Sequence, residues 1–148
     1  MEVMEITENK DQYMELLLIG DEQESMINKY LQRGVLFALF DDFDLKTVAV
    51  ITKEGDDTYE IKNIATLTIY QGKGYGSFMI KHIIQYCKGK CKNLLVGTGD
   101  IEDIIIFYEK FGFSYSHTVE DFFIKNYDHV IIEKGKQLKD MIYLKLKL

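Results

Sequence analysis

The sequence contains no proline and no tryptophan, and only two of its 148 residues are cysteines. Hydrophobic residues make up 47% and charged residues 28%, proportions that exclude a disordered, collagen-like or low-complexity chain. No run of apolar residues comes near the ~20 that a membrane-spanning helix requires. The sequence therefore predicts a globular chain without a transmembrane segment.

Cysteine and histidine are too scarce to suggest a metal site. Cys87 and Cys91 lie four residues apart, and no further cysteine or histidine stands at the spacing that a zinc site needs. We expect two unreactive thiols and no metal. The three histidines, His82, His117 and His129, show no spacing to a partner and are expected on the surface or in loops.

Positive charge is also in short supply, because 18 Lys and Arg residues face 24 Asp and Glu residues, a net charge of −6. A nucleic-acid partner would need a concentrated basic face, so we predict none. The first ten residues carry three glutamates ahead of a single lysine, the opposite of a basic secretion signal. We expect a cytoplasmic protein with no membrane partner.

The periodicity of the apolar residues predicts one domain over residues 1–148. Alternating polarity, or β-branched and aromatic composition, indicates strands, and apolar spacings of three and four indicate helices. The predicted strands are 2–6, 35–40, 47–52, 59–67, 92–96, 113–118 and 140–148, and the predicted helices are 7–20, 22–34, 74–88 and 103–111. A meander followed by βαβ units predicts the α/β (α+β) class, with a mixed, mostly antiparallel sheet of about seven strands flanked by about four helices.

The most informative segment joins the predicted strand 59–67 to the helix 74–88 and contains Gln71-Gly72-Lys73-Gly74-Tyr75-Gly76. Three glycines in five positions destabilise regular structure, by up to about 1 kcal/mol each relative to alanine in a helix. In return, backbone N–H groups at a helix N-terminus can converge on an anion, and a pyrophosphate can approach without meeting a Cβ atom. The segment predicts phosphate binding, although a tight turn alone would account for one of the glycines.

Two common nucleotide loops do not fit this segment. A nucleoside triphosphate loop would place Ser or Thr directly after its lysine, but Lys73 is followed by Gly74. The dinucleotide fingerprint would need glycine at position 77, which is Ser77. The phosphate is therefore expected to belong to another class of ligand.

Three segments together resemble the GCN5-related N-acetyltransferase (GNAT) superfamily: Ile-Lys-Asn-Ile-Ala-Thr-Leu at 61–67, the glycine turn at 71–76, and Phe-Tyr-Glu-Lys-Phe-Gly-Phe at 107–113. The resemblance implies a GNAT-like sheet over the whole chain and acetyl-CoA as cosubstrate. It implies that amides of the glycine turn hold the pyrophosphate of acetyl-CoA, while the end of the preceding strand pairs with the pantetheine arm. The residues assigned to acetyl-CoA in this way are Ala65, Thr66, Leu67, Gln71, Gly72, Lys73, Gly74, Tyr75, Gly76 and Ser77.

The resemblance also implies two catalytic residues. Tyr108 matches the tyrosine whose hydroxyl lies beside the CoA sulfur, and a phenol with a pKa of about 10 can donate a proton to the leaving thiolate at neutral pH. Glu60 stands at a family-like position for a carboxylate that helps to deprotonate the amine. Each has a structural alternative, Tyr108 as a packed core aromatic and Glu60 as a solvated residue beside the turn at 56–57. Ile101 departs from the asparagine that the family commonly has near this point.

The resemblance places the acceptor between segments 20–25 and 120–128. Six carboxylates on these segments could attract a cationic amine: Asp21, Glu22, Glu24, Glu120, Asp121 and Asp128. The aromatic residues of 122–127 fit either a cleft wall or a contact in a homodimer.

The predicted function is transfer of acetyl from acetyl-CoA by direct attack of an acceptor amine, on a small molecule or a peptide. The alternatives are a non-catalytic acyl-CoA-binding module, an acetyltransferase for protein N-termini or lysines, and transfer of a different acyl group.

Overall fold

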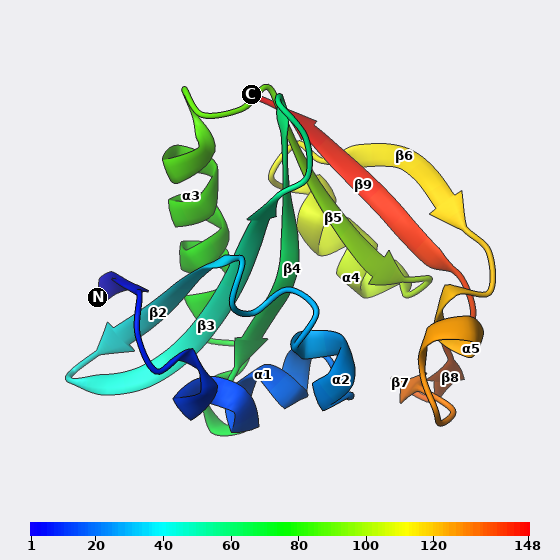
Figure 1. Ribbon diagram of the computed structural model, residues 1–148, viewed down its shortest axis with the longest axis horizontal. Helices are drawn as coiled ribbons and strands as arrows, with labels where there is room; N and C mark the ends of the chain where they lie inside the picture. Colours follow the sequence, from blue (N-terminus) through cyan, green and yellow to red (C-terminus); the bar gives the residue numbers. More distant parts are fainter.

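The computed structural model describes residues 1–148 and places seven strands in one sheet, in the order β1-β2-β3-β4-β5-β9-β6 (Figure 1). The strands are β1 (Glu2–Ile6), β2 (Val35–Asp41), β3 (Asp44–Lys53), β4 (Thr58–Thr66), β5 (Asn93–Gly99), β6 (Ser114–Val119) and β9 (Met141–Lys147). All neighbours are antiparallel except β4 and β5, which are parallel. The predicted mixed, mostly antiparallel sheet is confirmed.

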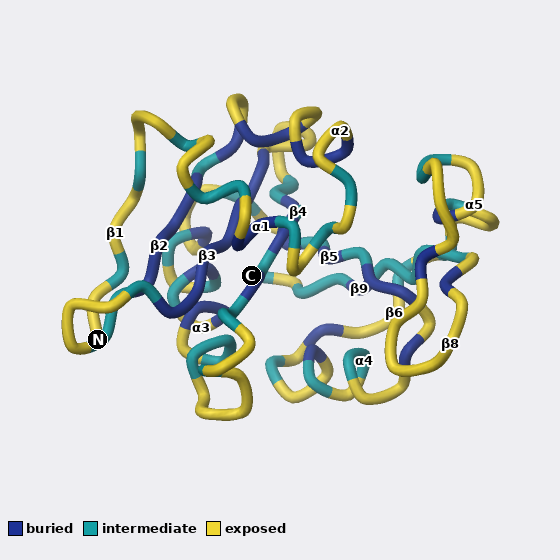
Figure 2. Tube along the Cα trace, turned by 90° about the horizontal axis from the view of Figure 1, so that it is seen from below, coloured by how far each residue is buried: buried dark blue, intermediate teal, exposed yellow.

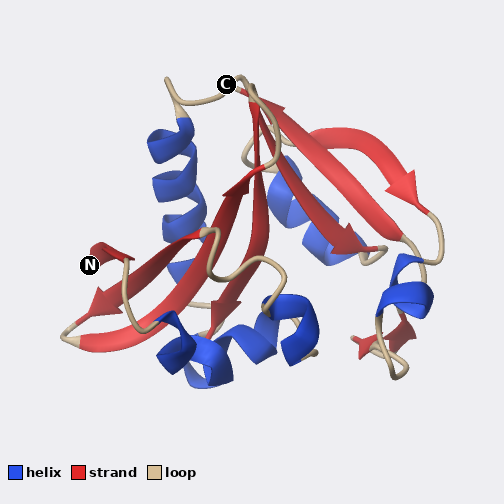
Figure 3. Cartoon of the chain, in the orientation of Figure 1, coloured by secondary structure: helices blue, strands red, loops and turns tan.

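Helices cover both faces of this sheet (Figures 2 and 3). They are α1 (Met14–Gly20), α2 (Glu24–Ile27), α3 (Tyr75–Cys87), α4 (Glu102–Glu109) and α5 (Phe122–Asn126), with 3-10 helices η1 (Lys10–Tyr13) and η2 (Thr68–Tyr70). None of them is long and apolar enough to cross a membrane. Cys87 and Cys91 are both free thiols, and Cys87 is buried in the core.

The alternation of side chains along β2 and β3 divides the core into two layers. Phe37 and Ala49 point toward α3 and α4 and join the larger buried cluster there. Leu36 and Val48 point the other way, into the cluster formed with α1 and α2. Both faces of the central strands are therefore buried, and for this reason the strands read as nearly continuous apolar runs.

The first two helices are shorter than the sequence predicted. The predicted helix 7–20 begins instead with η1, after Asn9 adopts a left-handed φ of 53°. The predicted helix 22–34 ends at Ile27, and turns follow up to Gly34. Tyr30 and Leu31 are nevertheless buried as predicted. The turns preserve the apolar spacing that a helix would have produced, so spacing alone could not distinguish them.

The segment between β6 and β9, for which the sequence predicted no helix or strand, contains α5 and a small hairpin. The hairpin pairs β7 (Ile132–Glu133) with β8 (Lys136–Gln137). Its turn residues Lys134 and Gly135 have φ values of 50° and 77°, as a two-residue turn of type I′ requires. A third buried cluster, made of Ile101, Phe123, Ile131 and Leu138, holds α5 and the hairpin against the start of α4.

Candidate active site

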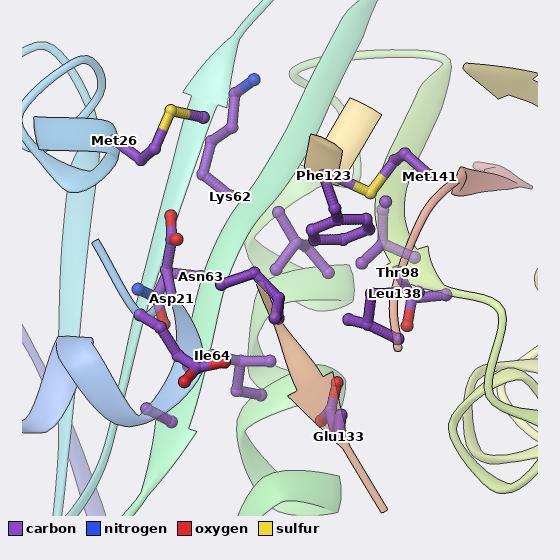
Figure 4. A pocket seen from close by; sticks show the side chains of 18 of the residues that line it. Asp21, Met26, Lys62, Asn63, Ile64, Thr98, Phe123, Glu133, Leu138 and Met141 are labelled. Atoms are coloured by element: carbon purple, nitrogen blue, oxygen red, sulfur yellow. The ribbon is translucent and has the colours of Figure 1, made fainter. Parts of the chain in front are cut away.

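The site begins where the two parallel strands of the sheet separate. β4 pairs with β5 only from Thr58 to Ile61, although β4 continues to Thr66 and β5 to Gly99. Lys62 forms a bulge, because Ile61 pairs with Ile51 and Asn63 pairs with Val50 on β3. Beyond the bulge the edge of β4 that faces β5 has no strand partner, and a cavity of about 810 Å³ opens there (Figure 4).

The glycine turn lies at the end of β4 and leads into α3. Gly72 and Gly74 have φ values of 76° and 91°, a conformation that side chains other than glycine rarely adopt, and Gly74 is the N-cap of α3. A Cβ atom at either position would have nothing within 4 Å. The backbone conformation therefore requires these glycines, while the space above them is open to a ligand at the positive end of a 13-residue helix.

The other residues of the turn have distinct surroundings. Gln71 lines the cavity and its amide donates to the Thr66 carbonyl at 3.1 Å, which ties the turn to the end of β4. The Tyr75 hydroxyl donates to Asp41 at 2.8 Å. Lys73 and Gly76 lie on either side of Gly74–Tyr75, and Gly76 is close to the Phe107 ring of α4. Ser77 lies in the first turn of α3.

The three residues predicted to pair with the pantetheine arm differ in availability. Ala65 and Thr66 line the cavity. The Leu67 N–H donates to the Lys46 carbonyl at 3.0 Å, and the Leu67 carbonyl accepts from Tyr70 at 2.8 Å. Because its backbone groups are already engaged, Leu67 offers less to a ligand than the two residues before it.

Tyr108 lies on α4 and its ring packs in the larger core cluster. The residue is only 6% exposed, and its ring packs edge-on against Phe107 and Phe113. Its hydroxyl forms no hydrogen bond within the protein, and the residue lines the cavity. Burial, and then the nearby charge of Glu133, raise the pKa of Tyr108 well above its usual value. The packing role and the predicted chemical role are therefore compatible in this one residue.

Glu60 lies on β4 just before the strands separate. It is 7% exposed and its carboxylate contacts the Lys62 ammonium at 3.1 Å. Burial raises the pKa of Glu60, and the charge of Lys62 opposes that rise. The alternative of a solvated residue beside the turn at 56–57 is wrong, because Glu60 is buried and lines the cavity.

The two segments expected around the acceptor meet across the cavity. Asp21 accepts hydrogen bonds from Tyr30 at 2.8 Å and from Tyr127 at 2.6 Å. Gln23 donates to the Asn126 carbonyl at 3.4 Å and accepts from the backbone N–H of residue 128 at 2.9 Å. These contacts join the α1–α2 connection to α5, which are about 100 residues apart in the chain. We call this set of hydrogen bonds, from Asp21 and Gln23 to residues 126–128, the strap.

Most of the six acidic residues predicted for the acceptor lie away from the cavity. Only Asp21 and Glu22 line it, and Asp21 is occupied by two tyrosines. The four that do not line it are Glu24, Glu120, Asp121 and Asp128.

A family model described as an acetyltransferase (GNAT) domain matches residues 32–115, more than half of the chain. The chain belongs to the GNAT family. It is an acetyl-CoA-dependent N-acetyltransferase, and the family predicted from the three sequence segments is confirmed. The uncharacterized N-acetyltransferase YvbK of Bacillus subtilis (strain 168) is 33% identical over 144 residues, 95% of this chain and 92% of that protein.

Solved structures of GNAT relatives cover nearly the whole chain. A GNAT acetyltransferase from Elizabethkingia anophelis with acetyl-CoA bound is 31% identical, with a TM-score of 0.95 over 99% of this chain and 97% of that one. An IAA acetyltransferase from Bacillus cereus ATCC 14579 is 33% identical, with a TM-score of 0.93 over 99% of both chains. An acetyltransferase from Bacillus subtilis in complex with CoA is 32% identical, with a TM-score of 0.92 over 99% and 98%.

Sequence reasoning missed several residues of this GNAT cavity. Asn63 next to the bulge donates to the Leu17 carbonyl at 2.9 Å and to Tyr30 at 3.1 Å, and so connects β4 to the strap. Glu133 and Leu138 reach the cavity from the hairpin. The turn Lys134-Gly135 between short β-prone stretches was the available signal for the hairpin, but nothing local indicated which wall it would join. The three histidines do not line the cavity.

Proposed function

We propose that residues 1–148 act as one acetyltransferase domain that transfers acetyl from acetyl-CoA directly to the amine of a small molecule. The small-molecule acceptor is inferred from the strap, whose hydrogen bonds bridge the cavity between the α1–α2 connection and α5. A peptide substrate would need an open groove through which its chain could pass on both sides of the reacting amine. The Bacillus cereus relative, named for the small molecule IAA, supports the same choice.

Acetyl-CoA would bind along the edge of β4 and at the glycine turn. The backbone amides of residues 71–77 would hold its pyrophosphate, where the two positive φ values leave the approach free of Cβ atoms. The unpaired edge of β4 at Ala65 and Thr66 would accept the pantetheine arm as an added strand. The solved relatives with acetyl-CoA or CoA bound support this cosubstrate.

The reaction needs one proton removed from the amine and one delivered to sulfur. The amine nitrogen attacks the thioester carbonyl carbon, the N–C bond forms and the C–S bond breaks. We assign Tyr108 as the acid that protonates the departing thiolate, since its hydroxyl has no other partner and stays protonated at neutral pH. We assign Glu60 as the base that receives the proton of the amine through water, with Lys62 stabilising its charged form.

A screen of amines tests this function. The purified protein and acetyl-CoA are incubated separately with a pool of small amines and with a peptide pool containing free N-termini and lysines, and products are identified by mass spectrometry. Acetylation confined to the small amines supports the proposal. Acetylation confined to peptides would overturn the small-molecule acceptor, and binding of acetyl-CoA without transfer to either pool would favour the non-catalytic alternative.

A further inference from the structure

Lys46 is the only buried cation in the protein. It lies on β3 and is 6% exposed, whereas all other lysines and arginines are at least partly exposed. None of the ion pairs in the structure includes Lys46. Buried lysines in proteins usually have a charged partner, so the surroundings of this ammonium must compensate it in another way.

A bulge in β3 aims the Lys46 side chain. Its neighbours Leu45 and Thr47 pair with consecutive residues of β2, so Lys46 is an extra residue without a partner there. Leu45 and Val48 both pack in the cluster toward α1 and α2. The two residues between them therefore face the opposite side of the sheet, where α3 lies. Regular alternation without the bulge would have pointed Lys46 toward α1.

On the α3 side the Lys46 ammonium meets two aromatic rings that flank the glycine turn. Its Nζ lies 3.4 Å from the centroid of the Tyr70 ring and 5.8 Å from that of the Tyr75 ring. Tyr70 ends η2 and Tyr75 begins α3, so the ammonium connects the two ends of segment 71–74. Lys73 in this segment also reaches the Tyr70 ring, with its Nζ 5.9 Å from the centroid. Cations are attracted to aromatic faces at such distances, most strongly where water is excluded.

We call Lys46, Tyr70 and Tyr75 the clamp. The two tyrosine rings contact each other edge-on, with centroids 6.3 Å apart. The Tyr75 hydroxyl donates to Asp41 at 2.8 Å, which attaches the clamp to β2 as well as to β3. On its other side the turn is tied to β4 by the Gln71 amide. The turn is therefore held from both sides by contacts outside it.

The glycines within the turn contribute little to holding it in place. Gly72 and Gly74 have φ values of 76° and 91°, and a Cβ atom at either position would have nothing within 4 Å. Glycine loses more conformational freedom on ordering than any other residue, so such a turn is costly to fix. Contacts that fix both of its ends before a ligand arrives lower the cost of binding, and a preorganised site binds more tightly.

We propose that Lys46 is a positioning residue for acetyl-CoA: through Tyr70 and Tyr75 it holds the glycine turn in the conformation that receives the pyrophosphate. This inference rests on the proposed function, in which the amides of residues 71–77 bind that group. Because Lys46 acts through the turn, its loss should weaken the binding of ligands that carry the pyrophosphate. Ligands that lack this group should bind as before.

The test compares acetyl-CoA with S-acetylpantetheine, which has the same thioester and arm without the pyrophosphate and adenosine. Dissociation constants are measured by calorimetry for acetyl-CoA and by NMR titration for S-acetylpantetheine. The proteins are the wild type, Lys46→Met, Lys46→Arg and Tyr70→Leu. Lys90→Met is the matched control, because Lys90 also lies over a tyrosine, 4.2 Å from the centroid of the Tyr86 ring, but beyond the C-terminal end of α3. Thermal unfolding of each variant verifies folding.

Lys46→Met keeps an unbranched apolar side chain and removes the ammonium. It should raise the Kd for acetyl-CoA by about fivefold or more, the scale of a lost cation–π contact, and leave that for S-acetylpantetheine nearly unchanged. Tyr70→Leu removes the ring instead and should have the same selective effect. Lys46→Arg should keep most of the affinity, because a guanidinium also binds aromatic faces. Lys90→Met should match the wild type with both ligands.

Equal losses with both thioesters would indicate a merely structural role for Lys46 and would overturn the inference, as would an acetyl-CoA affinity like that of Lys90→Met. If either Lys46→Met or Tyr70→Leu fails to fold, the other variant decides. Gly74→Ala separates the inference from the proposed function. If Gly74→Ala weakens acetyl-CoA binding and the clamp variants do not, only the role of Lys46 is wrong. If none of these variants weakens it, the pyrophosphate does not bind at the turn, and that part of the proposed function is overturned.

Discussion

Replacing Tyr108 by phenylalanine separates the catalytic role of this residue from its packing role. The substitution keeps the ring that packs against Phe107 and Phe113 and removes only the hydroxyl. Because that hydroxyl has no hydrogen bond within the protein, no intramolecular hydrogen bond is lost. We expect the free energy of unfolding to change by less than about 1 kcal/mol, the usual net contribution of one hydrogen bond.

The effect on turnover should be much larger. A positioned proton donor contributes a factor of about 100 or more, which corresponds to at least ~2.7 kcal/mol in the activation free energy. The assay follows release of the CoA thiol with a thiol reagent, and calorimetry measures acetyl-CoA binding, which should change little. Tyr115→Phe is the matched control, since Tyr115 is 64% exposed and its hydroxyl contacts only Thr118.

The pH dependence of the wild type provides a second readout for Tyr108. Burial and the charge of Glu133 raise the pKa of Tyr108, so its hydroxyl stays protonated as the pH rises. Activity should therefore show no loss from phenol ionisation up to a pH of about 10, where an ordinary tyrosine would already be half ionised. A Tyr108→Phe enzyme with full turnover would refute the assignment of this acid.

Three further predictions concern the rest of the site. Gly74→Ala should lower the free energy of unfolding by about 1–2 kcal/mol and raise the KM for acetyl-CoA, because Gly74 has a φ of 91°. Gly55→Ala is the control, since Gly55 lies in open space without a positive φ, and it should change neither quantity. Chemical denaturation measures the stability and steady-state kinetics measure the KM. Glu60→Gln should lower kcat and abolish the acidic limb of the kcat/KM profile against pH. In the wild type, activity should rise with pH along this limb, because a base acts only when it is ionised. The limb should lie above the usual glutamate pKa of about 4.3, because burial raises the pKa of Glu60. An unchanged limb would exclude Glu60 as the base. Gly20→Ala should lower the free energy of unfolding by about 1–3 kcal/mol, because a Cβ atom there would collide with the Asn63 side chain and lie 2.9 Å from the Ile64 carbonyl. If this variant were as stable as the wild type, α1 would have to be able to move away from β4.

The sequence predicted the elements whose signal is local. The sheet strands, α3 and the glycine turn were all expected close to where they lie, because apolar alternation, helical spacing and clustered glycines are each properties of short segments. The turns at 28–34 were mistaken for helix because their apolar residues keep helical spacing.

The acceptor side could not be predicted from local signals. Charge on a segment does not reveal which way its side chains point, so four of six acidic residues assigned to the cavity lie outside it. Glu133 reaches the cavity only because the third buried cluster fixes the hairpin against α4, and Asp21 is occupied only because Tyr127 arrives from the far end of the chain. Such contacts depend on the tertiary arrangement of segments that are distant in sequence.

The most direct test of the account is the affinity of a conjugate in which phenethylamine is joined through an acetyl carbon to the sulfur of CoA. If acetyl-CoA and a small amine occupy one continuous cavity for direct attack, the conjugate links two binding sites into one molecule. Titration calorimetry should then give a Kd at least about 100-fold below that of CoA alone. A conjugate that binds no more tightly than CoA would contradict a small-molecule acceptor site beside the thioester.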